Sequence, residues 1–500
     1  MAATLATPGV YIEEKSSFGS SVVPVQTAIP AFIGYTQKAN RGSKDLTNQP
    51  TKISSMGQFE ELFGGAPQTK FSIEAAEGSI TGFTLSYVDD TRYLLHNSMR
   101  FFYANGGGDC YIVSVGSYSD KIDAGQLNDP KGGGITSLEK HLEPTILVVP
   151  EAVLLSEADC YSLQAAMLTH CGYKMKNRFA VLDVYNGNTE RTFDDEDVIN
   201  KFREGVGSNF LQWGASYYPY LNTTIVKSSE INYTRIANLD GLAEILSKEV
   251  ADNLAADNIT EARAEGINAE IAKIAEDNDS DAIKSLNATL TVISPKLNMI
   301  IAEISEMLNV MPPSPAMAGA YTMVDSTSSV AQSPANISLG SVVSTTVNIN
   351  NDNQEDLNLP LNGKAVNAIR SFQGKGVLVW GARTLEGNSQ DFRYISVRRT
   401  MTFLEQSIKF AAEAFVFAPN NATTWSTLRA TVANFLTNQW QGGLLAGQSP
   451  DDAFEIEIGL GATMTPTDIL DGVLKMTIRV AITRPAEFIV ITFEQQQQKS

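Results

Sequence analysis

The C-terminal part of the chain alternates apolar and polar residues with the period of β-strands. Apolar residues alternate with glutamates in segment 454–460, and with Lys475, Thr477 and Arg479 in segment 474–482. A period of two is typical of a strand with one buried and one solvent-facing side. If the two strands pair, the acidic face of the first lies beside the basic face of the second, which contributes about 0.2–1 kcal/mol per cross-strand pair.

A third C-terminal segment has no polar face. Its apolar residues are Phe488, Ile489, Val490, Ile491 and Phe493. Such a strand needs cover on both sides, yet only a polar tail, 494–500, follows it. Another β-prone segment lies near the N-terminus, contains Val10, Tyr11 and Ile12, and precedes a Ser- and Gly-rich stretch, 16–21. Strand exchange between subunits requires β-prone chain ends on flexible connecting segments, and both ends of this chain fit that pattern.

The middle of the chain predicts layered structure followed by helices. Strand and helix patterns alternate between residues 144 and 220, which favours an α/β layer with a mostly parallel sheet. From residue 227 to 311, apolar residues repeat at helical spacing and the polar positions are strongly acidic, so we expect a helical insertion. Two further helices, 398–417 and 425–440, precede the C-terminal strands and predict a compact α+β domain.

Composition excludes several classes of function. The 500 residues are 43% hydrophobic and 19% charged, which is ordinary for a folded chain. A net charge of −19 argues against nucleic acid as a partner. No apolar run approaches the ~20 residues of a membrane-spanning helix, and no signal peptide precedes the chain, so we expect cytoplasmic assembly without membrane insertion. Cys110, Cys160 and Cys171 are expected to be buried thiols.

Segments that resemble chemical sites have simpler explanations. The glycine run 106–108 follows a helical pattern and precedes a strand, the reverse of a phosphate-binding loop, so it predicts a helix stop. Asp183 with Asn186 and Gly187 has the groups to hold a metal or a ribose, but a turn is the simpler interpretation. The histidines are not at metal-ligand spacing. We therefore predict no enzyme activity, no catalytic residue, no cofactor and no metal.

Six segments carry a resemblance to one family. In chain order they are 8–14 (PGVYIEE), 31–34 (AFIG), 101–113 (FFYANGGGDCYIV), 379–385 (VWGARTL), 393–399 (RYISVRR) and 484–488 (RPAEF). Each is a weak signal alone, but all six in this order are specific. The chain resembles the contractile tail sheath proteins of phages, R-type pyocins and extracellular contractile injection systems. The resemblance spans most of the chain and fades between residues 223 and 308.

The resemblance implies a division of the chain. It implies an N-terminal arm (1–28), an outer α/β domain (29–339) with a mostly parallel sheet and a helical insertion (223–311), an inner α+β domain (340–484) and a C-terminal arm (485–500). The inner domain is expected to be completed by strands from neighbouring subunits.

The resemblance also implies a structural function. Sheath subunits polymerise as helically stacked rings around an inner tube, between a baseplate and a terminal cap, and contract to drive the tube through a target envelope. By this resemblance the inner-tube contact is assigned to Arg398, Arg399 and Lys409. The particle is a phage tail or a tail-like particle, released or anchored in an envelope, and whether sister sheath proteins share it stays open. The alternatives are a nucleotide-binding α/β enzyme and another self-assembling protein, such as a capsid or surface-layer subunit.

Overall fold

The computed structural model describes residues 22–76, 78–276 and 279–490, and these fall into two compact units. Of the described residues, the sheet unit comprises those within 26–402 together with 484–490, and the C-terminal unit comprises 403–483 together with 22–25. Of the expected arm residues, Phe488, Ile489 and Val490 are described, whereas Val10, Tyr11, Ile12, Ile491 and Phe493 lie outside the described residues.

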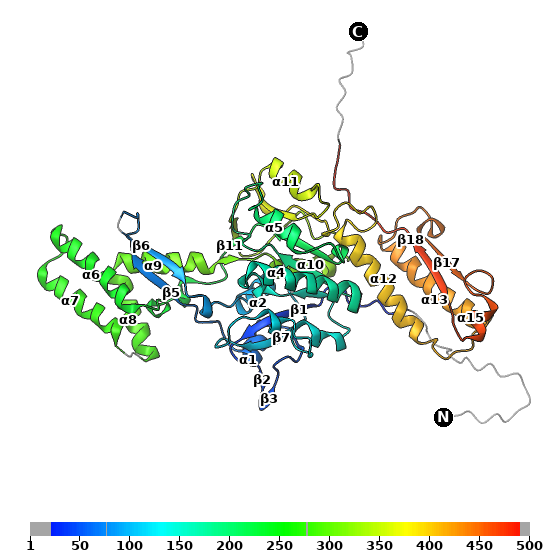
Figure 1. Ribbon diagram of the computed structural model, residues 1–500, viewed down its shortest axis with the longest axis horizontal. Helices are drawn as coiled ribbons and strands as arrows, with labels where there is room; N and C mark the ends of the chain where they lie inside the picture. The colour runs from blue at the N-terminus through cyan, green and yellow to red at the C-terminus, as the bar shows by residue number, and fades with distance from the viewer. Residues whose placement is uncertain (1–21, 77, 277–278, 491–500) are drawn as a thin grey trace, which may run out of the picture. The chain divides into compact units, whose positions relative to one another are not determined.

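Within the described residues, the sheet unit is built on a nine-stranded sheet (Figure 1). In spatial order its strands are β13 (Ile337–Ser338), β16 (Gly376–Val379), β15 (Asn367–Phe372), β10 (Gly214–Tyr218), β9 (Phe179–Asp183), β8 (Ile146–Val148), β1 (Pro30–Thr36), β7 (Cys110–Ser117) and β4 (Thr51–Ile53). The strands from β15 to β7 pair in parallel, and the pairings at the two edges are antiparallel. The predicted mostly parallel sheet is confirmed.

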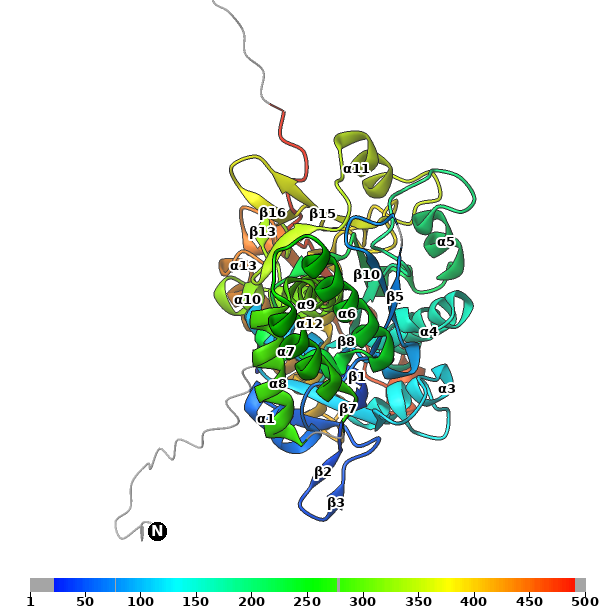
Figure 2. The same cartoon turned by 90° about the vertical axis from the view of Figure 1, so that its left-hand side faces the viewer.

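Helices cover both faces of this sheet, which explains the apolar composition of its central strands. Every residue of β1 and β9 is buried, as expected for strands with packing on two sides. Figure 2 shows α1 (Met56–Phe63) and α10 (Ser314–Thr327) on one side, where α2 (Leu95–Ala104) also packs, and α3 (Ala124–Leu127), α4 (Glu157–Thr169) and α5 (Val198–Gly205) on the other. The sheet is therefore the central layer of the unit.

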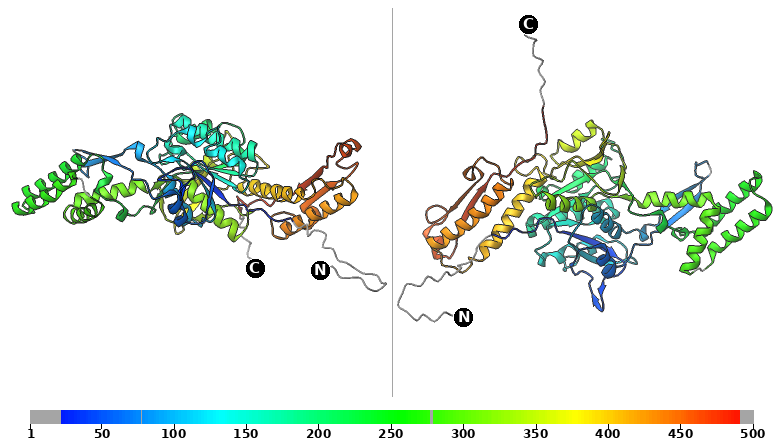
Figure 3. Two further views of the ribbon diagram at one scale, coloured as in Figure 1. Left: turned by 90° about the horizontal axis from the view of Figure 1, so that it is seen from below. Right: turned by 180° about the vertical axis from the view of Figure 1, so that it is seen from behind.

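The helical insertion shares a hydrophobic core with a distant hairpin. The insertion contains α6 (Leu239–Ala255), α7 (Glu261–Ala272), α8 (Ser280–Ile293) and α9 (Pro295–Leu308), where apolar spacing predicts helices. The hairpin of β5 (Phe71–Ala75) and β6 (Phe83–Tyr87) lies beside these helices in both views of Figure 3. Its Phe71, Ile73 and Phe83 are buried in the same core. We call the helices and the hairpin together the insertion module.

The C-terminal unit contains the strand pair predicted from alternating charges. β17 (Phe454–Ile458) pairs antiparallel with β18 (Met476–Val480) and places Glu455 opposite Arg479. The Arg479 guanidinium lies 2.7 Å from Glu455 and 3.3 Å from Glu457. The unit also contains the end of α12 (Ile395–Glu413), together with α13 (Ala422–Gln441), α14 (Pro450–Ala453) and α15 (Pro466–Leu470). The pairing and its charge complementarity are confirmed.

The compact units divide at a different point from the boundary expected at residue 340. The division falls between Thr402 and Phe403, inside α12. The reason is that β15 and β16 hydrogen-bond to the large sheet through the pairing of β15 with β10. Residues 340–402 therefore pack with the sheet unit, although they come late in the chain.

Candidate assembly site

Three of the sequence motifs meet at one carboxylate of the sheet unit. Glu487, from the last motif, accepts hydrogen bonds from Arg383 of the fourth motif, with Nε at 2.9 Å and Nη2 at 2.7 Å. The hydroxyl of Tyr394, from the fifth motif, donates to the same carboxylate at 3.0 Å. The amide of Asn358 donates at 2.8 Å. We call this arrangement the Glu487 anchor, and it fixes the chain immediately after the C-terminal unit.

Arg383 is also positioned by groups other than Glu487. Its side chain is 1% exposed, and Nη1 donates to the carbonyl oxygens of Asn358 and Gly387. Its backbone N–H donates to Asn367 Oδ1 at 2.8 Å. Burial opposes the charged form of Glu487, but the hydrogen bonds from Arg383 and Asn358 outweigh it, so the pKa of Glu487 lies below its ordinary value. The anchor is therefore a buried, charged and oriented pair.

The residues that follow the anchor leave the fold. Phe488, Ile489 and Val490 are 67%, 78% and 89% exposed. Within the described part of the chain, residues 485–490 pair with no strand. Consecutive exposed apolar side chains are characteristic of a segment that binds a partner. The described part of the expected C-terminal arm is thus held at its base and free beyond it.

The strand pair of the C-terminal unit has edges that can accept further strands. Among the described residues, β17 and β18 form a sheet of two strands only, supplemented by one bridge between Leu445 and Ile482. A short sheet of this kind presents unpaired backbone N–H and C=O groups on both outer edges. These groups are complementary to an extended segment with free backbone groups of its own.

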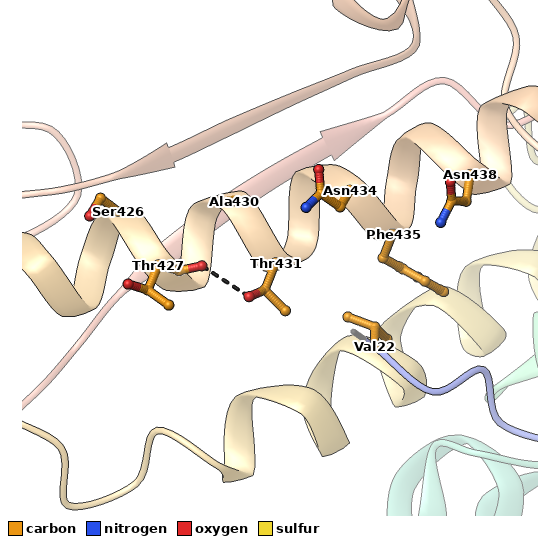
Figure 4. A pocket seen from close by; sticks show the side chains of 8 residues that line it. All are labelled: Val22, Ser426, Thr427, Ala430, Thr431, Asn434, Phe435 and Asn438. Atoms are coloured by element: carbon orange, nitrogen blue, oxygen red, sulfur yellow. Dashed lines mark hydrogen bonds between the residues drawn. The ribbon is translucent and has the colours of Figure 1, made fainter. Parts of the chain in front are cut away.

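The first described residues of the chain are tied to helices of the same unit. Val22 is 6% exposed and lies beside Phe435 in a groove on α13 of about 590 Å³ (Figure 4). The groove is otherwise lined by Ser426, Thr427, Ala430, Thr431, Asn434 and Asn438. The backbone N–H of Val25 donates to Ser407 Oγ at 3.2 Å. The N-terminal segment therefore has a docking position on the C-terminal unit.

The residues assigned to the inner-tube contact lie in two different environments. Arg399 is buried, donates to both carboxylate oxygens of Asp325 at 2.6 and 3.0 Å, and lies over the ring of Tyr321. Arg398 is buried with its guanidinium 4.3 Å from the centre of the Trp213 ring. Lys409 is exposed. Both arginines are therefore buried with partners inside the sheet unit, whereas Lys409 is exposed, and the assignment of the three residues to the tube contact stays a prediction.

The segments weighed as chemical sites have structural roles. Asp183 accepts hydrogen bonds from the backbone N–H and hydroxyl of Ser314 at the start of α10. Asn186 and Gly187 form a turn closed by a hydrogen bond from Gly187 N–H to the carbonyl of Val184. The glycine run follows the end of α2, and Gly106 has a φ of 87°. The turn and the helix stop are thus as predicted.

The cysteines are buried and unpaired, also as predicted. Burial raises the pKa of Cys110 and Cys171 to about 12, and raises that of Cys160 further. The described residues contain no cluster of three or more His, Cys, Asp or Glu arranged to hold a metal ion. Among them there is also no helix that is long and apolar enough to cross a membrane.

The Glu487 anchor was not foreseen, although its residues stand in the recognised motifs. The signal was present in their charges: each of two separated motifs carries a conspicuous ionisable residue, Arg383 in one and Glu487 in the other. Sequence reasoning gave neither residue a role, because nothing in a linear pattern states that segments 104 positions apart meet.

Comparisons with known proteins identify relatives of this arrangement. Residues 388–496 match the family described as "Phage tail sheath C-terminal domain". No curated protein sequence matches the chain. Among solved structures, a chain of the anti-feeding prophage (AFP) baseplate shares 25% identity at a TM-score of 0.60, over 98% of this chain and 99% of that chain.

A sheath structure in the contracted state is similarly close. The PVC sheath complex of an extracellular contractile injection system shares 26% identity at a TM-score of 0.59, over 99% of both chains. The AFP helical sheath in the contracted state has the same fold, at 24% identity and a TM-score of 0.59 over 98% of this chain and 99% of that chain. The family match over residues 388–496 and the structural match over nearly the whole chain both point to tail sheath proteins. In its C-terminal fifth the chain matches the phage tail sheath C-terminal domain family, and over nearly its whole length it is similar to the sheath chain of an extracellular contractile injection system.

Proposed function

We propose that this chain is the structural subunit of the contractile sheath of a phage tail or phage-tail-like contractile injection system. Subunits assemble as helically stacked rings around an inner tube, and contraction of the sheath drives the tube through a target envelope. The observation that carries the proposal is the agreement with sheath chains over 98–99% of the length. Work in such a particle comes from re-packing of subunits, so the chain needs no catalytic site.

The two ends of the chain join neighbouring subunits in this proposal. The C-terminal arm extends from the Glu487 anchor, and its apolar residues add a strand to the β17–β18 sheet of another copy. The N-terminal arm extends from Val22 and contributes in the same way. Each added backbone hydrogen bond is worth about 0.5–1.5 kcal/mol, and the sum repeats at every subunit along the sheath.

The anchor gives these connections a mechanical role. Contraction requires rigid units to rotate while subunits stay attached. A buried ion pair at the base of the arm transmits tension to the large sheet, whereas a segment beyond it can bend. The support for this role is the contrast between buried Arg383 and exposed Val490.

The partners follow from the same proposal. They are further copies of this chain, an inner tube protein, a baseplate and a terminal cap. Lys409 is the residue of the assigned basic set that is accessible for a tube contact. Assembly takes place in a cytoplasm, and nucleic acid is not a partner of a chain with a net charge of −19.

A nucleotide-binding enzyme is the weaker alternative. Such enzymes bind ligands beyond the carboxyl ends of parallel strands. At the end of β9, however, the carboxylate of Asp183 is occupied by Ser314. A thermal-shift measurement with common nucleotides separates the two functions, since only an enzyme of this kind is stabilised.

Electron microscopy of the purified chain tests the proposal. We expect the chain expressed alone to form long hollow tubes in negative stain. A monomer that persists at high concentration in light scattering contradicts the proposal. Assembly into flat sheets or closed shells favours a surface-layer or capsid protein instead.

A further inference from the structure

A small basic hairpin projects from the sheet unit. Strands β2 (Asn40–Arg41) and β3 (Lys44–Asp45) pair with each other, and all their residues are exposed. Figures 1 and 2 show the hairpin extending beyond the body of the unit at its lower edge. The side chains of Arg41 and Lys44 make no hydrogen bond or ion pair with any residue that the structure describes. We call residues 40–45 the basic hairpin.

The positive charge is confined to the tip of the hairpin. Helix α1 packs beside β2 and carries the exposed acids Glu60 and Glu61. Arg41 and Lys44 flank the turn, away from these acids along the hairpin. In a chain with a net charge of −19, a projecting tip with two unpaired cations is suited to bind an acidic surface.

The opposite edge of the same unit is acidic. In Figures 1 and 2, α5 and α11 (Asn351–Asn358) lie at the upper edge, away from the hairpin. Exposed acids of these two segments and of the loop before α5 are Glu190, Asp194, Asp195, Glu196, Glu204, Asp352 and Glu355. Phe193 and Leu361 are exposed beside them. We call this surface the acidic edge.

The acidic edge is held rigid from beneath. Asp197, buried at the start of α5, accepts hydrogen bonds from the backbone N–H groups of Thr192 and Phe193. Arg191 and Arg203 both contact Asp356, at 2.6 and 2.9 Å, and so connect the loop, α5 and α11. An ordered acidic surface with exposed apolar side chains has the composition of a binding surface and not of a solvated loop.

We infer that the basic hairpin of one copy docks on the acidic edge of the next copy. The inference rests on the proposed function, because the partner is a second copy of this chain. One copy carries both surfaces on opposite edges, so the contact is head-to-tail, and such contacts propagate as rings or helices. Arg41 and Lys44 would lie against Glu190 and Asp195, and their aliphatic stems can cover Phe193.

Charge reversal on each surface separately tests the docking. Exposed ion pairs are individually weak and are screened by salt. Assembly should therefore become more sensitive to the salt concentration in a variant that keeps few of these pairs. We expect the R41E/K44E variant and the E190K/D195K variant each to lose tubes in negative stain, because each then presents like charges across the contact. Neither pair of sites is buried, so both variants should keep the circular dichroism and melting temperature of the unmodified chain.

Mixing the two variants provides the decisive measurement. In the mixture, the acidic hairpin of one variant meets the basic edge of the other, and the remaining pairing is the native one. We expect tubes to return in the mixture. The matched control for the hairpin variant is R263E/K284E, which makes the same change of net charge as R41E/K44E on exposed positions of the insertion module and should leave tubes intact.

Each outcome decides the inference. Tubes from both single variants, or failure of the mixture to recover while both components stay folded, overturn the docking but leave the sheath function standing. Loss of tubes in the control to the same extent also overturns it, since net charge alone then explains the effect. If the unmodified chain forms no tubes, the proposed function itself fails.

Discussion

Arg383 and Glu487 form a two-point ion pair with nitrogen–oxygen distances of 2.9 and 2.7 Å, and Arg383 is almost fully buried. Breaking a buried pair costs more than the pair itself contributes, because the remaining charge stays buried without a partner. The pair also joins the end of the chain to the motif after β16. Its loss should therefore affect both the stability of the sheet unit and the direction in which the arm leaves.

Substitution of the anchor carboxylate should destabilise the sheet unit. We expect Glu487→Gln to lower the free energy of unfolding by about 3 kcal/mol, because Arg383 loses its countercharge in a buried site. Urea denaturation followed by circular dichroism measures the change. The control is Glu386→Gln in the same region, whose carboxylate makes no ion pair with a described residue. Equal effects from the two substitutions would show that the anchor is not a special contact.

The contribution of Glu151 to stability should fall as the pH rises toward neutrality. Glu151 is fully buried, and burial raises its pKa to about 7 against the hydrogen bonds from Leu95 and Leu94. Between its ordinary value of 4.5 and about 7, the folded chain keeps a proton that the unfolded chain has released. The contribution of Glu151 to the free energy of unfolding therefore decreases with rising pH across this window, and its loss is complete above it. Asp183 acts in the same direction, with its pKa also raised to about 7.

The variant Glu151→Gln isolates this contribution. At about 1.4 kcal/mol per pKa unit, the wild-type chain loses up to about 3 kcal/mol through Glu151 alone. The variant cannot ionise at this position, so its melting temperature should decline less between pH 4.5 and 7. Scanning calorimetry over that range measures the change of melting temperature with pH, and Glu61→Gln at an exposed position is the control. Parallel pH profiles for wild type and Glu151→Gln would refute the assignment.

Local patterns in the sequence predicted local structure well. The β17–β18 pair followed from alternation, since strand period and cross-strand charge both act over neighbouring residues, as Glu455 and Arg479 show. The parallel sheet followed from the order of strands and helices. Apolar residues of α1 share one helical face and are buried, with Phe59 and Phe63 fully enclosed.

Long-range partners could not be predicted in the same way. The ion pair of Arg399 has no local signal, because its partner, Asp325, lies 74 residues earlier. Arg398 is covered by Trp213, from a different part of the sheet unit. The position of β15 in the large sheet could not be predicted either, since a late strand can join an early sheet without any local signal.

The insertion module supplies a prediction about deletions. Replacing residues 239–308 with a Gly/Ser linker removes α6–α9 but leaves the β5–β6 hairpin without cover. Exposing Phe71, Ile73 and Phe83 forfeits about 1.5–3 kcal/mol for each side chain. We expect this deletion variant to aggregate. Binding of a hydrophobic dye to the exposed apolar surface measures the effect.

A second deletion tests whether the uncovered hairpin, and not the rest of the sheet unit, causes the aggregation. Removing residues 71–87 together with 239–308 takes away both halves of the shared core, so solubility and the melting transition of the remaining sheet should return. Size-exclusion chromatography and calorimetry compare the two deletion variants. A soluble chain after the first deletion alone would mean that the hairpin does not depend on the helices.

Truncation after the anchor distinguishes a partner-binding arm from a strand of the chain's own core. Deleting residues 488–500 removes described side chains that are 67–89% exposed, so circular dichroism and the melting curve should stay unchanged. Tubes should be lost, because each neighbour then lacks its added strand.

Deleting residues 487–500 should also lower the melting temperature, since Arg383 loses its carboxylate. Val490→Asp should reproduce the loss of tubes alone, because a charge in an apolar interface is costly. Ordered tubes from the 488–500 truncation would exclude the strand-adding role, and a lost folded signal would place the segment in its own subunit's core.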